Sequence, residues 1–170
     1  MKAIRDLSHS ERDALKTKHL NARHFKTHFS DVIDETHCYE MAIYPTDYRR
    51  IWIHACIPNL STYPNQKLSE VIDYLKSQED FTKISIPMFL NLQQLKNYID
   101  VLSQCKDKSE HCFDEISGFN CFLLDRDGIE VTDGMHRLVA YGLVTNMKEE
   151  NFPISVYLGT SKSIEEIDVI

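Results

Sequence analysis

The segment 119–143, FNCFLLDRDGIEVTDGMHRLVAYGL, constrains the fold of this 170-residue chain more than any other part. It holds two runs of apolar and β-branched residues, 119–125 and 129–133, on either side of an Asp-Gly pair. Asp-Gly suits a tight hairpin turn because glycine accepts a positive φ. Apolar residues at helical spacing follow over 135–144. The segment therefore predicts a β-hairpin that leads directly into a helix.

The other regular elements are predicted from the spacing of apolar residues. Further helices are expected over 8–23, 67–78 and 92–105, a strand over 153–159, and a short helix or edge segment over 163–170. The runs 37–45 and 51–57 are rich in β-forming residues, and we expect them to pair as a hairpin across the polar turn between them. Together these elements predict an α/β (α+β) fold, with a small mixed β-sheet flanked by helices.

The composition is that of an ordinary soluble globular protein, and 170 residues without a long linker predict a single domain over 1–170. The formal net charge of −7 disfavours nucleic acid and anionic membranes as partners. The N-terminal residues lack the apolar stretch of a signal peptide, and no apolar run reaches the roughly 18 residues of a membrane span. Five scattered cysteines fit a reducing compartment, with buried thiols. We therefore expect a cytoplasmic protein with no membrane partner.

The corner at 133–137, Asp-Gly-Met-His-Arg, is the strongest candidate for a functional site. The first N–H groups of a helix lack intrahelical partners and the helix dipole makes that end positive, so a helix that starts here attracts anions. Gly134 allows a ligand close to the backbone, and Arg137 offers a planar fork of donors to phosphate oxygens. His136 can donate to a phosphate or act as an acid or base. Asp133 can cap the helix or coordinate a phosphate-bound Mg²⁺.

A purely structural interpretation of this corner fits the spacing equally well. In that interpretation Asp133 is only an N-cap and Gly134 only a turn residue, while the side chains of His136 and Arg137 are merely solvated. The two interpretations differ in whether the polar groups meet at a ligand. Residue types and spacing alone leave both open.

The run CFLLDRDGIEVTDGMHRLVAYGL, followed by FPISVYLG, resembles the core of the ParB/sulfiredoxin-like superfamily. In that family a hairpin delivers a D-G-x-H-R element to a helix N-terminus, and a further strand follows. The resemblance covers 119–159 and leaves 1–115 as a family-specific N-terminal part. It implies a nucleotide-phosphate site with Asp133 beside it, formed by Gly134, Met135, His136 and Arg137.

The resemblance does not by itself choose a reaction, because the family includes sulfiredoxins, nucleotide-using kinases of free serine, CTP-dependent ParB clamps and nuclease-like proteins. Sulfiredoxins have a catalytic cysteine where this chain has Met135, whose thioether cannot replace a thiolate nucleophile. ParB clamps add a helix-turn-helix domain, for which 138–170 leaves little room. We expect a nucleotide-dependent phosphotransferase (a small-molecule kinase) or hydrolase that uses a nucleoside di- or triphosphate and Mg²⁺. The alternatives are a non-catalytic nucleotide-binding regulatory module and a ParB-like nuclease.

A phosphotransferase also needs a carboxylate base near the hydroxyl group of its acceptor, a small-molecule substrate. Glu130 is the candidate. Strand alternation puts Glu130 and Thr132 on the face opposite Ile129 and Val131, and so either beside the pocket or in solvent. The expected catalytic residues are Asp133, His136 and Glu130.

Other polar residues receive mostly structural interpretations. Asp125 and Asp127 are interpreted as turn formers, and Arg49-Arg50 as a solvated pair or a second phosphate contact. His24 and His28 have helical spacing but no acidic partner at a diagnostic distance, so no metal site is predicted.

Overall fold

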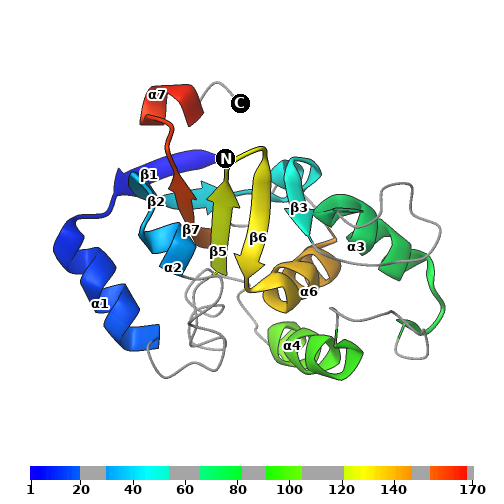
Figure 1. Cartoon of the computed structure of the whole chain (residues 1–170). Coiled ribbons are helices and arrows are strands. Elements are labelled where there is room, and N and C mark those ends of the chain that lie inside the picture. The colour runs from blue at the N-terminus through cyan, green and yellow to red at the C-terminus, as the bar shows by residue number, and fades with distance from the viewer. Residues whose placement is uncertain (20–29, 54–65, 82–90, 105–120, 147–153, 168–170) are drawn as a thin grey trace.

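A computed structural model describes residues 1–19, 30–53, 66–81, 91–104, 121–146 and 154–167 (Figure 1). The strands are β1 (Lys2–Asp6), β2 (His37–Ile43), β3 (Ile51–Ile53), β4 (Gln66–Lys67), β5 (Cys121–Asp125), β6 (Ile129–Asp133) and β7 (Ile154–Thr160). The helices are α1 (His9–His19), α2 (Ser30–Ile33), α3 (Leu68–Ser77), α4 (Leu92–Gln104), α6 (Met135–Thr145) and α7 (Ile164–Ile167), with a 3-10 helix η2 (Pro45–Arg49). The prediction of a mixed α/β fold is confirmed.

The strands form one seven-stranded sheet in the order β1-β2-β7-β5-β6-β3-β4. β5 and β6 are the antiparallel hairpin that the sequence predicts, and Gly128 in its turn has a φ of +142°. The hairpin joins the sheet through parallel neighbours, β7 beside β5 and β3 beside β6. The sheet is therefore mixed, and the hairpin that leads into α6 lies in its middle.

The predicted hairpin between 37–45 and 51–57 is wrong. β2 pairs with β1 and β7, while β3 pairs with β4 and β6, so three strands separate the two runs in the sheet. β2 is buried along most of its length, which suits a strand with neighbours on both edges. The chain then enters η2 at Pro45, and the Asp47 carboxylate accepts the N–H of Tyr44 at 2.8 Å. This 3-10 helix replaces the expected hairpin turn.

The main core lies between the sheet and helices α3, α4 and α6 (Figure 1). The predicted helices over 67–78 and 92–105 are confirmed as α3 and α4. The apolar stripe of α3, Leu68, Val71, Ile72 and Leu75, is fully buried in this core. In β5, Cys121 and Leu123 face the same core, whereas Phe122 between them belongs to a smaller cluster with Val32 and Ile33 of α2 on the other face. Helices thus cover both faces of the central hairpin.

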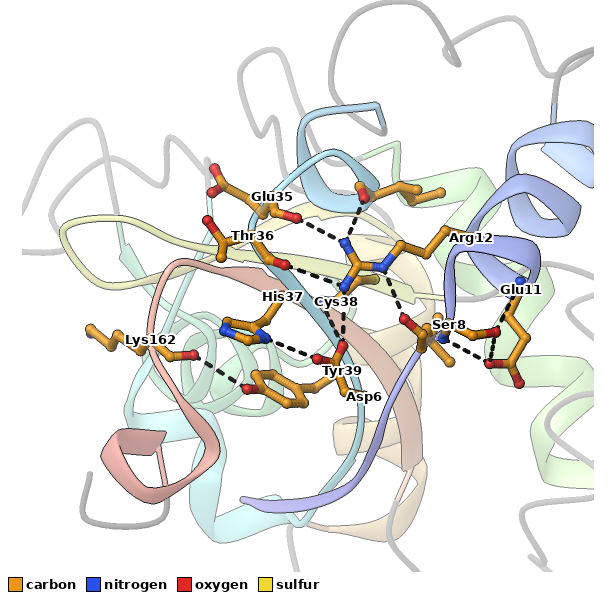
Figure 2. Close-up of polar contacts among 12 residues, drawn as sticks. Asp6, Ser8, Glu11, Arg12, Glu35, Thr36, His37, Cys38, Tyr39 and Lys162 are labelled. Carbon is orange, nitrogen blue, oxygen red and sulfur yellow. Dashed lines mark hydrogen bonds and ion pairs between the residues drawn. The ribbon is translucent and has the colours of Figure 1, made fainter.

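A polar cluster fastens α1 to the sheet (Figure 2). Arg12 of α1 donates hydrogen bonds to the carbonyl oxygens of Leu7 (3.1 Å) and Glu35 (2.9 Å) and to the carboxylate of Asp6 (3.1 Å). Asp6 Oδ2 also lies 2.9 Å from Nδ1 of His37, at the start of β2. Because the side chain of Arg12 is only 12% exposed, this one guanidinium links β1, α1 and the α2–β2 connection in a partly buried setting.

The remaining expectations concern the ends of the chain, the thiols and the membrane. The helix predicted over 8–23 is present as α1, with 20–23 outside the described residues, and of the short helix or edge segment expected over 163–170 the described part contains the short helix α7. Cys38 and Cys121 are buried, and burial raises the pKa of the Cys38 thiol to about 11. Within the described ranges no helix is both long enough and apolar enough to cross a membrane.

Candidate functional site

The predicted corner is formed by the end of β6 and the start of α6, with Gly134 between them as the N-cap. Gly134 has a φ of +90°, in the left-handed region that favours glycine. A Cβ at this position would lie 2.6 Å from Sγ and 3.0 Å from Cα of Cys121. The absence of a side chain is thus required by packing against β5, a role that the sequence does not reveal.

Two backbone donors in the first turn of α6 have no acceptor among the described residues, and we call them the open N–H groups. The carbonyl oxygen of Gly134 accepts the N–H groups of Arg137 and Leu138, each at 3.0 Å. No side chain caps the helix, and among the described residues none accepts the N–H groups of Met135 and His136. Asp133 Oδ1 accepts the N–H of Gly134 at 2.7 Å, outside the helix. Of the two roles that the sequence leaves open for Asp133, the N-cap role is excluded, since Gly134 is the N-cap.

Arg137 is buried at the corner instead of solvated. Its side chain is 5% exposed, and Nη2 lies 3.5 Å from Oδ2 of Asp133, whose side chain is 51% exposed. The two residues are four apart in the sequence, with Asp133 at the end of β6 and Arg137 in the first turn of α6. The guanidinium thus has a carboxylate neighbour, and a phosphate at this corner would have to share Arg137 with Asp133 or replace it.

His136 connects α6 to α4. Its Nε2 accepts the backbone N–H of Asn91 at 2.8 Å, so the ring is neutral and carries its proton on Nδ1. Burial lowers the pKa of His136, and the guanidinium of Arg137 lowers it further, while Asp133 opposes both. The sequence carries a signal for Asn91 itself, because asparagine is a preferred N-cap before an apolar-periodic helix. It carries none for the contact with His136.

Glu130 lies on the other side of the sheet from α6. Ile129 and Val131 are buried in the main core, so alternation along β6 turns Glu130 to the opposite face, as the sequence predicts. There its register partner on β3 is Trp52, and Nζ of Lys67 lies 3.4 Å from the centre of the Trp52 ring. The structure therefore brings Asp133, Gly134, His136 and Arg137 together but does not bring Glu130 to the helix side of the corner.

The other candidates have separate roles. Asp125 is buried, and its Oδ2 accepts a hydrogen bond from Nζ of Lys162 at 2.9 Å. The same oxygen lies 3.4 Å from Oγ1 of Thr160. Its interpretation as a mere turn former is wrong, whereas Asp127 is an exposed turn residue as expected. The Arg49-Arg50 pair is exposed. His24 and His28 lie outside the described residues. Within those residues no three His, Cys, Asp or Glu side chains are grouped as metal ligands.

Comparisons with known protein families, with curated proteins and with solved structures give no match to this chain. The chemistry of the corner therefore rests on its own residues. It combines open helix N–H groups, one buried guanidinium, one half-exposed carboxylate and a neutral imidazole. The first two attract an oxyanion, and the carboxylate suits a cation that accompanies a phosphate.

Proposed function

We propose that the corner at 133–137 binds the phosphates of a nucleoside di- or triphosphate, and that the protein is a nucleotide-dependent phosphotransferase with a ParB/sulfiredoxin-like core. The observation that carries the proposal is the pair of open N–H groups, those of Met135 and His136, at the start of an 11-residue helix beside the guanidinium of Arg137. These groups are positive and directional before any ligand arrives. The resemblance of 119–159 to that superfamily supports the same assignment.

In this proposal the phosphate of the ligand replaces part of the contact between Arg137 and Asp133. A phosphate at the open N–H groups would draw on the Arg137 fork, which suits two phosphate oxygens, and so weaken its contact with Asp133. Asp133 then fits Mg²⁺ in that ion's usual mode, with one or two carboxylates and the phosphates as ligands. Mg²⁺ would supply neutralisation of the phosphate charge. Asp133 therefore serves the metal, and Arg137 with the helix amides serves the phosphate.

The base of a transfer reaction depends on where the acceptor binds. Glu130 can take a proton only from a substrate on the face of the sheet that carries Trp52, because alternation turns it away from α6. Glu130→Gln tests this role. It should abolish transfer and leave nucleotide binding intact if Glu130 is the base, and it should change neither if the acceptor binds on the α6 side.

Nucleotide binding is the first property to measure. ATP, ADP, CTP and GTP, each with Mg²⁺, should raise the melting temperature of the wild-type protein through binding to the folded state. Arg137→Gln should remove this shift. Arg126→Gln is the matched control, since it removes the same charge from an exposed arginine. Arg126 lies in the distant β5–β6 turn and pairs with Glu35 at 3.2 Å. Circular dichroism checks that both variants fold. An equal shift in the wild type and Arg137→Gln would place the ligand elsewhere.

A second candidate function is a non-catalytic nucleotide-binding regulatory module. It is favoured by the internal partners of the corner, since Arg137 pairs with Asp133 and His136 with Asn91. Incubation with a bound nucleotide, Mg²⁺ and a pool of hydroxylated metabolites separates the two functions. Transfer or release of phosphate supports the enzyme, whereas binding without turnover supports the regulatory module.

A further inference from the structure

A hydrogen bond joins the amino ends of α4 and α6. Asn91 and His136 lie 45 residues apart in the sequence, and the N–H of Asn91 donates to Nε2 of His136 at 2.8 Å. Asn91 is also the N-cap of α4, because its Oδ1 accepts the N–H of Gln94 (3.0 Å) and its carbonyl oxygen that of Leu95 (2.9 Å). The His136 ring therefore holds the first turn of α4 against the first turn of α6, the two helices that pack side by side in Figure 1.

The contact requires a neutral ring, because a protonated Nε2 cannot accept a hydrogen bond. Asp133 and Arg137 are the charged groups of β6 and α6 that act on the ring, with opposite signs. From α4, the group that faces the ring is the uncharged amide of Asn91. Burial and Arg137 together favour the neutral form, so the contact persists at neutral pH and is lost in acid.

We propose that His136 is a positioning residue of the oxyanion site, whose neutral ring holds the amino end of α4 at the corner and so sets the shape that an oxyanion meets there. The ligand in this inference rests on the proposed function, but the helix contact does not. Nε2 is occupied by Asn91, so His136 is not a phosphate ligand through that atom. Loss of the contact would let the N-terminal end of α4 move relative to the open N–H groups of α6. The positive end of the α4 helix dipole would move with it, away from that of α6.

Two substitutions separate positioning from direct binding. In His136→Gln the amide oxygen replaces Nε2 as acceptor and does not titrate near neutral pH. His136→Ala removes the acceptor. The amide resonance of Asn91 should follow protonation of the His136 ring in the wild type below about pH 6.5. It should stay unchanged over that range in His136→Gln, and its hydrogen exchange should accelerate in His136→Ala. An Asn91 resonance that ignores the titration of the ring would overturn the contact.

Pyrophosphate binding tests the positioning role, with calorimetry at pH 7.5. His136→Gln should bind within about twofold of the wild type, and His136→Ala about tenfold more weakly, the loss expected for one hydrogen bond. Equal weakening in both variants would make His136 a direct ligand and overturn the proposal. If the wild type binds no pyrophosphate while the Asn91 resonance still titrates with the ring, the oxyanion site and the positioning role both fail, although the helix contact stands.

Discussion

Gly134→Ala should destabilise the protein strongly, because the structure imposes two separate costs at this position. The backbone φ of +90° is left-handed, which costs an L-residue with a Cβ about 1–2 kcal/mol. The new Cβ would also lie 2.6 Å from Sγ of Cys121, and such overpacking costs about 1–3 kcal/mol. The free energy of unfolding should therefore fall by about 2–5 kcal/mol, measured by urea denaturation of the ligand-free protein.

Two further variants divide this loss into its parts. Gly128→Ala is a comparison at a second positive φ, since Gly128 has a φ of +142° and a Cβ there would meet Trp52 only at 3.4 Å. It should carry the backbone cost without the clash. Cys121→Ala removes Sγ, the closest atom, so Gly134→Ala should cost about 1 kcal/mol less in that background than in the wild type. If Gly134→Ala costs no more than Gly128→Ala, and Cys121→Ala gives no relief, the packing role of Gly134 is refuted.

Three further outcomes test other parts of the structure. Arg12→Gln should lower the free energy of unfolding by about 2–4 kcal/mol, because it removes several partly buried hydrogen bonds. An unchanged midpoint of urea denaturation would contradict the role of Arg12 in holding α1 to the sheet. Asp125→Asn should cost about 1–2 kcal/mol in thermal unfolding, less than a fully buried pair because Lys162 is 36% exposed. The pKa of His136 in the folded protein is lowered from 6.5. As the pH falls, the unfolded chain therefore binds a proton at this residue before the folded protein does. Stability should therefore fall as the pH drops below about 6.5, and this part of the loss should be missing in His136→Gln.

The parts of the fold that the sequence predicts are those in which neighbouring residues settle the structure. An Asp-Gly turn fixes β5 and β6 as a hairpin, and four apolar residues on one stripe fix α3. Strand partners are different, because they depend on segments far apart in the sequence. β2 was expected to pair with β3, but its two edges pair with β1 and β7. No local pattern distinguishes these partners.

The candidate site follows the same division. The sequence places Asp133, Gly134, His136 and Arg137 at one corner, because a strand, a glycine and a helix follow one another there. The contact of Gly134 with Cys121 arises only when α6 packs on β5, and the burial of Arg137 also depends on tertiary packing, so neither is predicted. The role of Asp125 likewise depends on tertiary packing that the local sequence does not show.

The Asp125 ion pair depends on a distant strand. Its partner Lys162 follows β7, and the parallel pairing of β5 with β7 sets Asp125 opposite Thr160. The sequence of the β5–β6 turn by itself therefore does not predict the ion pair between Asp125 and Lys162.

The backbone amides of the corner give the most direct test of the central claim, that the start of α6 binds phosphates. In a ¹H–¹⁵N titration of the wild-type protein with ADP and Mg²⁺, the amide resonances of Met135 and His136 should shift in a saturable manner. They should shift far less in Arg137→Gln. Saturable shifts confined to other parts of the chain, or none at millimolar nucleotide, would contradict the claim.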